Sequence, residues 1–258
     1  MRLTARKRYG QHFLHDANII RRILDAIGPQ DAERFVEIGG GLGALTAPLA
    51  PRVAHLDVVE VDARLAAELR VRFADDPNVT IHEADALAFD ISACAAATGK
   101  LRVAGNLPYN ISTQLLFHMM KFKTLIHDMH FMLQKEVVDR MTAAPGSKSY
   151  GRLTVMLSRW FDIEACFDIR PGSFRPPPRV MSTLARVTVR EVPRFDVGDE
   201  QRFASLVAHL FSMRRKTLGR ALRGRVSPDS LAALGIDART RAETLSPERL
   251  AALADVSL

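Results

Sequence analysis

The tetrapeptide Asn106-Leu107-Pro108-Tyr109 places an amide, a proline and an aromatic ring directly after an apolar run, Leu101–Ala104, that is typical of a buried strand. Proline fixes its own φ and pushes the preceding residue toward an extended backbone, so the segment predicts a small rigid shelf. The amide of Asn106 accepts through oxygen and donates through nitrogen, and the flat ring of Tyr109 suits a planar ligand. These groups could hold the exocyclic amine of a base for chemical attack, although the same residues also suit an ordinary loop turn.

A glycine-rich turn, Gly39-Gly40-Gly41-Leu42-Gly43, follows another apolar run, Arg34–Ile38. Missing side chains let a ligand approach the backbone, and a helix that begins here presents free N–H groups. Gly39, Gly41 and Ala44 match the G-x-G-x-x-A dinucleotide pattern, so the turn alone leaves NAD open. Glu60 ends the next predicted strand. There its carboxylate would accept from the ribose hydroxyls of NAD or of another nucleoside cofactor such as S-adenosylmethionine.

Three further polar residues distinguish between these cofactors. Glu37 stands just before the glycine turn, where a carboxylate would repel a pyrophosphate but attract an ammonium or sulfonium group. Asp85 follows the third predicted strand, placed to accept from an adenine amino group, and Asn106 follows the fourth. Open α/β sheets bind ligands at the carboxyl ends of their strands, where all three lie. The set predicts S-adenosylmethionine, whereas Asp85 alone is more typical of a loop or a helix cap.

The elements that position these residues alternate between strand and helix. Predicted strands are Arg34–Ile38, His55–Val61, Val79–His82, Leu101–Ala104 and Met129–Leu133, and predicted helices between them are Leu42–Leu49, Arg64–Phe73 and Ser112–Met120. An earlier helix is predicted between a cap at Asp16 and a stop at Gly28-Pro29. This alternation is typical of βαβ units and predicts an α/β fold with a parallel sheet.

The later part of the chain has a different pattern. Ile163–Ile169 and Val180–Val189 predict two strands joined by a proline-rich loop, which we expect to add to the sheet edge in antiparallel fashion. Beyond residue 200 the apolar spacing is helical, and Ser246 with Pro247 predicts the start of a last helix. We therefore expect an α/β domain over residues 1–190 and a small all-helical, basic C-terminal domain over residues 200–258.

The charge distribution predicts a polyanionic partner. The formal net charge is +7, and the acid-free stretch Gln201–Pro228 carries seven Arg and Lys residues. Two clusters, Arg6-Lys7-Arg8 and Arg214-Arg215-Lys216, are candidates for phosphate binding, with an ordinary solvated basic face as the alternative.

Other features of the chain exclude classes of protein. No apolar stretch approaches the ~20 residues that span a bilayer, and no apolar signal core follows the basic start. We therefore expect a cytoplasmic protein that does not associate with a membrane. Cys94 and Cys166 lie far apart without the spacing of metal ligands, so we expect reduced, buried thiols and no metal.

Longer segments resemble one family, the bacterial small-subunit ribosomal RNA adenine dimethyltransferases. The N-L-P-Y tetrapeptide is their form of the N/D-P-P-Y/F motif of amino-group methyltransferases. The resemblance covers residues 5–250 and is carried by the segments Arg6–Leu14, Gly105–Ser112, Met132–Val137, Phe174–Val180 and Phe211–Lys216.

The resemblance implies a Rossmann-like S-adenosylmethionine-dependent methyltransferase that dimethylates N6 of two adjacent adenosines in a hairpin near the 3′ end of 16S rRNA. Its substrate would be the assembling 30S small subunit, and we expect the enzyme to act as a monomer. Implied cofactor contacts, together with the glycine turn, are His12, Leu14, Gly39, Gly41, Glu60, Asp85 and Asn106. Two positions depart from the family pattern: Gly40 replaces a common proline, which should loosen the loop, and His12 replaces asparagine.

The expected mechanism holds a flipped adenine. The oxygen of Asn106 and the carbonyl of Leu107 accept from N6, and Tyr109 stacks on one face of the base. The resemblance implies Phe174 for the other face, where a core phenylalanine is the alternative. Three other functions stay open: a resistance-type methyltransferase acting on large-subunit RNA, an assembly factor for which methylation is secondary, and a nicotinamide dehydrogenase.

Overall fold

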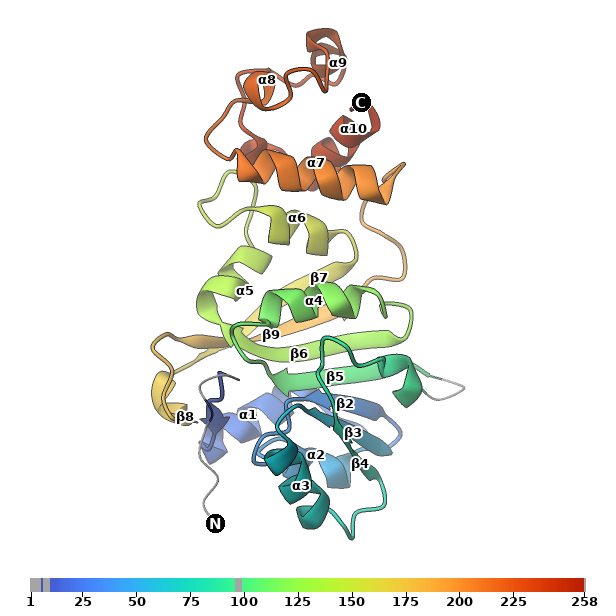
Figure 1. Ribbon diagram of the computed structural model, residues 1–258, viewed down its shortest axis with the longest axis vertical. Coiled ribbons are helices and arrows are strands. Elements are labelled where there is room, and N and C mark those ends of the chain that lie inside the picture. Colours follow the sequence, from blue (N-terminus) through green and yellow to red (C-terminus); the bar gives the residue numbers. More distant parts are fainter. Residues whose placement is uncertain (1–5, 7–9, 96–98, 258) are drawn as a thin grey trace. The chain divides into compact units, whose positions relative to one another are not determined.

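The computed structural model describes residue 6, residues 10–95 and residues 99–257. The chain divides into two compact units (Figure 1). The first contains Met1–Val138 and Ile163–Val189, and the second contains Asp139–Asp162 and Arg190–Leu258. The residues before 163 that join the second unit were predicted to belong to the α/β domain. They belong elsewhere because Tyr150 and Val155 are buried in the same apolar cluster as the C-terminal helices.

The first unit is built on a seven-stranded sheet with the order β4-β3-β2-β5-β6-β9-β7. Its strands are β2 (Arg34–Ile38), β3 (His55–Glu60), β4 (Val79–Glu83), β5 (Leu101–Asn106), β6 (Ile126–Gln134), β7 (Phe161–Ile169) and β9 (Ser182–Val189). The five strands from β4 to β6 pair in parallel, and β9 pairs antiparallel with β6. The parallel sheet and its antiparallel addition confirm the prediction.

Helices connect the strands of this sheet. They are α1 (Ala17–Ile27), α2 (Thr46–Leu49), α3 (Ala63–Arg72) and α4 (Ser112–Met120), with short 3-10 turns η2 (Ala50–Arg52), η3 (Ile91–Cys94) and η4 (Pro171–Ser173). Asp16 caps α1 by accepting from the N–H groups of Asn18 and Ile19, and Gly28 ends the helix with φ of 56°. Both helix signals are confirmed because a side-chain acceptor and a left-handed glycine satisfy the helix ends.

The helix after the glycine turn is shorter than predicted. The prediction ran from Leu42 to Leu49, whereas α2 begins at Thr46. Gly41 and Gly43 have φ of 56° and 75°, which no right-handed helix contains, so the chain makes tight turns before α2.

Two short strands tie the N-terminal segment to the proline-rich loop. β1 (Phe13–Leu14) pairs antiparallel with β8 (Phe174–Arg175), so that Leu14 lies opposite Phe174. Both side chains are buried in the cluster that includes Ile23 and Leu24 of α1 and Leu56 and Val58 of β3. Burial of this apolar surface fixes the N-terminal segment beside the carboxyl edge of the sheet.

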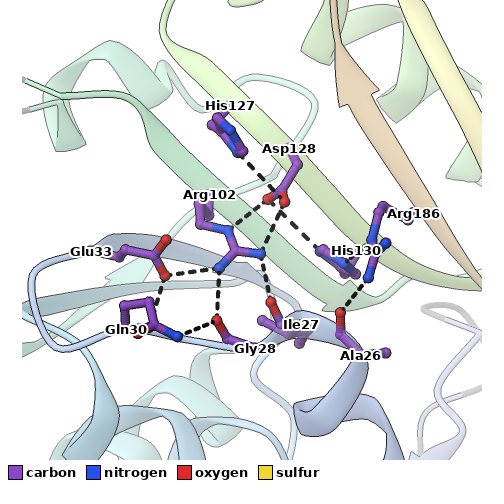
Figure 2. A network of polar contacts seen from close by, with 10 residues as sticks. All are labelled: Ala26, Ile27, Gly28, Gln30, Glu33, Arg102, His127, Asp128, His130 and Arg186. Carbon is purple, nitrogen blue, oxygen red and sulfur yellow. Dashed lines mark hydrogen bonds and ion pairs between the residues drawn. The ribbon is translucent and has the colours of Figure 1, made fainter.

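A buried ionic network anchors the end of α1 to the sheet (Figure 2). Arg102 on β5 binds Asp128 on β6 through two hydrogen bonds of 2.8 and 2.9 Å. The same guanidinium donates to Glu33 at 2.8 Å and to the carbonyl of Ile27 at 2.7 Å. One side chain therefore satisfies two carboxylates and a free carbonyl at the C-terminus of α1.

His130 extends this network as a neutral group. Burial lowers the pKa of His130 to about 4, which outweighs the opposite effect of Asp128. Its Nε2 accepts from Arg186 at 3.1 Å, and Arg186 also donates to the carbonyl of Ala26 at 2.7 Å (Figure 2). A second arginine therefore binds the last turn of α1.

The second unit is helical. It contains α6 (Arg152–Ser158), α7 (Glu200–Ser212), α8 (Leu218–Ala221), α9 (Pro228–Ala233), η5 (Ala242–Thr244) and α10 (Pro247–Asp255), and α5 (Lys135–Met141) leads into it. Ser246 caps α10 and Pro247 occupies its first position, as predicted. Tyr150 packs edge-on against Phe211 and donates to the carbonyl of Leu245 at 2.9 Å. None of the helices formed by the described residues is both long and apolar enough to cross a membrane.

Candidate active site

A cavity lies at the carboxyl ends of β2, β3, β4 and β5 in the first unit. All seven residues predicted to contact the cofactor line it: His12, Leu14, Gly39, Gly41, Glu60, Asp85 and Asn106. They come from five separate segments of the chain, and the parallel sheet brings them together because its strands end at one edge. Glu37 also lines the cavity.

The glycine turn forms one wall of this cavity by close approach of the backbone. A Cβ at Gly40 would lie 2.4 Å from Cγ1 of Val58 and 2.9 Å from Cδ1 of Leu69. Gly39 has φ of 79° and donates its N–H to the carbonyl of Val59 at 2.8 Å. Glycine at position 40 thus permits tight packing on β3 and α3, which gives a physical reason for the departure from the proline of many relatives.

Glu60 presents a fixed carboxylate to the cavity. Its two oxygens accept from the N–H groups of Gly41 and Asp62, each at 2.9 Å. Burial raises the pKa of Glu60, and these two hydrogen bonds oppose that rise. Each oxygen keeps a second lone pair, so the group is oriented to accept from a vicinal pair of hydroxyls.

Replacing Glu60 with alanine is expected to weaken binding of S-adenosylmethionine by about 1–3 kcal/mol, because the ribose hydroxyls would be left without acceptors in a closed site. Isothermal titration calorimetry of the full chain measures this loss. Glu83→Ala is the matched control, since Glu83 lies opposite Glu60 on β4 but does not line the cavity. Equal affinity of folded Glu60→Ala and the control would remove Glu60 from the site.

Glu37 is a buried acid with a strongly perturbed pKa. Burial raises its pKa to about 8, a hydrogen bond from Thr46 opposes the rise, and the charge of Glu60 adds to it. Oγ1 of Thr46 donates to Oε2 of Glu37 at 2.6 Å. A cation placed beside such a buried carboxyl group strongly stabilises its ionised form. This agrees with the predicted role of Glu37 next to an ammonium or sulfonium group.

Glu37→Gln is expected to stabilise the free protein and weaken cofactor binding. Between pH 4.5 and 8 the unfolded chain loses the Glu37 proton while the folded chain keeps it, so Glu37 destabilises the fold increasingly as pH rises. Glutamine does not titrate and still accepts from Thr46. The unfolding temperature of the variant should match the parent at pH 5 and exceed it at pH 8. A stability difference independent of pH would contradict the raised pKa.

Asn106 and Tyr109 are held in defined orientations at the mouth of the cavity. Nδ2 of Asn106 donates to the carbonyl of His12 at 2.7 Å, which turns Oδ1 away from that carbonyl. The hydroxyl of Tyr109 lies 2.7 Å from Oγ of Ser182, and its ring stacks on His12 with centroids 5.5 Å apart. Nδ1 of His12 lies 2.8 Å from the carbonyl of Pro176. The predicted shelf is therefore rigid, and His12 braces it.

A second cavity shares Gly10, Gln11, His12 and Tyr109 with the first. Its other lining residues are Gln134, Pro176, Pro177, Arg179 and Val180. Tyr109 therefore borders the first cavity, which the predicted cofactor residues line, and the second cavity, which the proline-rich loop lines. A planar group could approach Asn106 from the second cavity while a cofactor fills the first.

Phe174, predicted to cover a face of the substrate base, is buried in the protein without RNA. It is only 2% exposed, packs in the apolar core and lines neither cavity. It lies opposite Leu14 in the pairing of β8 with β1. Its contact with the base stays a prediction.

The two basic clusters differ in what their side chains contact. Arg214 is engaged within its own unit, donating to Glu243 at 2.5 Å and to the carbonyl of Lys148 at 2.7 Å. Arg215 and Lys216 are exposed. Nη1 of Arg6 lies 3.8 Å from Oδ1 of Asp62, and the predicted phosphate contacts Lys7 and Arg8 lie outside the described residues.

Sequence reasoning missed several residues that orient the site. Asp62 caps α3 and accepts from Gln11 at 3.3 Å, which ties the N-terminal segment to the start of α3. A hydrogen bond from the side chain of Arg64 lowers the pKa of Asp62 to about 2, although burial acts to raise it. An aspartate two residues before the predicted helix Arg64–Phe73 was the available signal for Asp62. Thr46 and Ser182 gave no signal, because their partners are distant in sequence.

The fold and the cavity define a Rossmann-like, S-adenosylmethionine-dependent methyltransferase. A family model described as "Ribosomal RNA adenine dimethylase" matches residues 2–257. The chain belongs to this family, which confirms the resemblance and excludes the dehydrogenase. It is 48% identical over 252 residues to "Ribosomal RNA small subunit methyltransferase A" of Nitrosococcus oceani, covering 96% of this chain and 94% of the relative. The protein of that name from Aromatoleum aromaticum is 50% identical, covering 94% and 90%.

Solved structures agree on the fold. A dimethyladenosine transferase from Plasmodium falciparum superposes with a TM-score of 0.80 and 22% identity, over 95% of this chain and 99% of that chain. The 23S rRNA methyltransferase ErmE gives a TM-score of 0.73 and 25% identity, over 94% and 98%. The predicted combination of a methyltransferase domain and a helical C-terminal part is confirmed.

Proposed function

We propose that this enzyme transfers methyl groups from S-adenosylmethionine to N6 of two adjacent adenosines in a hairpin near the 3′ end of 16S rRNA. The substrate is the rRNA of an assembling small subunit in the cytoplasm, and the enzyme acts as a monomer. The observation that carries this proposal is the Asn106–Tyr109 shelf between two cavities, one lined by the cofactor residues and one bordered by the proline-rich loop.

The cofactor cavity supplies a partner for each polar part of S-adenosylmethionine. Glu60 would accept from the ribose hydroxyls, Asp85 from the adenine amine, and Glu37 would face the ammonium or sulfonium. The bound cofactor supplies a methyl group activated by the positive sulfur. Because the donor is already activated, alignment of the two reacting atoms within ~3–3.5 Å is most of what the protein must add.

Asn106 acts on the nucleophile. The N6 lone pair of adenine is delocalised into the ring, and it becomes reactive when both N6 hydrogens are held by acceptors that favour a tetrahedral nitrogen. Oδ1 of Asn106 and the carbonyl of Leu107 supply these acceptors. The N–H of Leu107 bonds the carbonyl of Met132 at 3.3 Å, which fixes the peptide. After transfer the proton passes to water, so no strong base is needed.

Tyr109 supports the flipped base by stacking, an interaction worth about 1–3 kcal/mol per base. The bond between its hydroxyl and Ser182 holds the ring plane in place. His12 stacks on the same ring in the free protein, so an incoming base has to displace His12 or stack on the opposite face. The second methylation on each adenine requires room for a monomethylated amine at the same site.

Arg215 and Lys216 are proposed to bind RNA phosphates. Replacing both with glutamine should lower affinity for the subunit and flatten its salt dependence by about 0.7 per lost contact for single-stranded RNA. Arg214 stays in place in this variant because its contacts with Glu243 and Lys148 hold the second unit together. Filter binding across a salt series measures the slope, with thermal unfolding as the fold control. An unchanged slope would make the two residues an ordinary solvated face.

The substrate is tested by transfer of labelled methyl groups to unmethylated small subunits, large subunits and free RNA, followed by identification of the modified nucleoside. We expect N6,N6-dimethyladenosine in small subunits alone. Label in large-subunit RNA would instead support the resistance-type activity for which the likeness to ErmE leaves room. Tight binding of small subunits without label would support an assembly factor.

A further inference from the structure

Asp57, His82 and Cys94 form a polar cluster that the proposed methyl transfer does not use. They lie on β3, β4 and η3, respectively, and none of them lines the cofactor cavity. One ligand atom from each side chain lies within 4.8 Å of the other two. A carboxylate, an imidazole and a thiol this close together form a ligand set suited to a metal ion.

The cluster is set by the register of the sheet. β3 and β4 pair so that Asp57 lies opposite Thr80 and Val59 opposite His82. Side chains alternate along a strand, so His82 projects from the same face of the sheet as Asp57. The core residues Leu56 and Val58 occupy the opposite face. Cys94 reaches this face from η3.

Asp57 is a buried carboxylate with one oxygen left without a full partner. The residue is 4% exposed, and its Oδ1 lies 2.8 Å from Nε2 of His82. Oδ2 is buried and has no hydrogen bond of normal geometry among the described residues. Sγ of Cys94 lies within 4.8 Å of a carboxylate oxygen of Asp57, but an S–H group is a weak donor. A buried anionic oxygen with so little compensation favours the approach of a cation.

His55 lies beside Asp57 but outside the set of three residues whose ligand atoms are mutually within 4.8 Å. Nε2 of His55, at the start of β3, lies 3.6 Å from Oδ1 of Asp57. Ligand atoms of a tetrahedral zinc site lie about 3.3–3.7 Å apart, as metal–ligand distances of about 2.0–2.3 Å require. The Asp57–His82 contact of 2.8 Å has to open, and Sγ of Cys94, which lies within 4.8 Å of both partners, has to come into this range when the metal binds.

We propose that Asp57, His82 and Cys94 bind one divalent metal ion of the zinc class, with His55 or water as the fourth ligand. Thiolate and imidazole ligands favour zinc or cobalt over magnesium or calcium, which prefer oxygen. The metal–sulfur bond forms as the thiol loses its proton to solvent. The ion links β3 and β4 to η3 and so fixes both ends of the loop from Asp85 to Cys94. Its role is therefore structural.

Arg34 competes with the metal for Asp57. Its Nη2 lies 3.8 Å from Oδ2 of Asp57, too far for a hydrogen bond, and its Nε donates to the carbonyl of Cys94 at 3.2 Å. The guanidinium is partly exposed and can turn toward solvent when a cation enters. Removing this positive charge in Arg34→Gln should therefore tighten metal binding.

The test is titration of the full-length, untagged, metal-stripped protein with Co²⁺, followed by displacement with Zn²⁺. Tetrahedral cobalt bound to a thiolate gives intense visible bands and a sulfur-to-cobalt charge-transfer band. We expect these bands at one ion per chain in the parent and in Cys166→Ser, which removes the other cysteine. Cys94→Ser should abolish the charge-transfer band, His82→Gln should weaken binding at least tenfold, and Arg34→Gln should strengthen it.

A measurement on the unmodified sequence guards against a variant that fails to fold. Alkylation of Cys94 by a maleimide, located by mass spectrometry, should be slowed by Zn²⁺, whereas alkylation of Cys166 should not change. Absence of the cobalt bands in the parent would overturn the proposal, as would equal bands in folded Cys94→Ser. Equal alkylation of Cys94 with and without Zn²⁺ would also overturn it. These readouts do not depend on methylation, so their failure leaves the proposed function standing.

Discussion

Asn106→Ala is expected to lower the methylation rate at saturating S-adenosylmethionine by about 10²–10³-fold, the size of effect seen when one polar group aimed at a reacting centre is removed. Alanine keeps the backbone but removes the oxygen that holds N6 of the adenine. It also removes the bond to the carbonyl of His12, so some loss of cofactor affinity should accompany the change. Single-turnover kinetics with unmethylated small subunits measures the rate.

Subunit binding separates this explanation from a general loss of structure. Affinity for small subunits should be almost unchanged in Asn106→Ala, because binding is assigned to basic surfaces such as Arg215 and Lys216. Asn110→Ala is the matched control, since Asn110 is exposed in the same loop and lines neither cavity. Near-normal turnover in Asn106→Ala would show that the catalytic assignment is wrong. Parallel loss of binding and turnover would show that the two are not separable.

Arg102→Met is expected to reduce the free energy of unfolding by about 3–5 kcal/mol, because it leaves the carboxylate of Asp128 buried without its partner. Two hydrogen bonds to Asp128, one to Glu33 and one to the carbonyl of Ile27 are lost together. Chemical denaturation followed by circular dichroism measures the change. The loss should appear as lower stability of the first unit, whose sheet and first helix the network joins.

Two further variants identify the cause of that loss. Arg70→Met removes an exposed arginine paired with Glu83 at 3.3 Å and should cost less than about 1 kcal/mol. Adding Asp128→Leu to Arg102→Met should recover part of the stability, because no buried charge is then unpaired. The losses in free energy of unfolding of Arg102→Met and Asp128→Leu are added and compared with the loss in the double variant. If the two values are equal, the lost packing of Arg102 is responsible, and not the unpaired charge of Asp128.

The sequence was sufficient for the parts of the structure that depend on local pattern. Strand Arg34–Ile38 and helix Ser112–Met120 have their predicted bounds. The predicted cofactor residues line one cavity because polar side chains that follow successive parallel strands must meet at one edge. That rule needs no knowledge of side-chain conformation, so the strand pattern alone predicts that Glu60, Asp85 and Asn106 lie close together.

Contacts that depend on a partner elsewhere in the chain could not be predicted from local pattern. Phe174 is buried because β8 pairs with β1, a contact between residues more than 150 positions apart in sequence. Arg214 carries the same charge as Arg215 in the sequence, and the positions of Glu243 and the Lys148 carbonyl distinguish them. The segment after residue 138 joins the helical unit through Tyr150 and Val155, whose apolar character fits either core. Asp57, His82 and Cys94 likewise have no motif spacing, since register alone brings them together.

The most direct test of the central claim is a crystal structure of the full chain with S-adenosylhomocysteine, the product left after methyl transfer. The account predicts the ribose hydroxyls within hydrogen-bonding distance of Glu60, the adenine amine beside Asp85, and the sulfur facing the shelf of Asn106 and Tyr109. A product bound outside this cavity would contradict the assignment. So would a product inside it whose sulfur points away from Asn106.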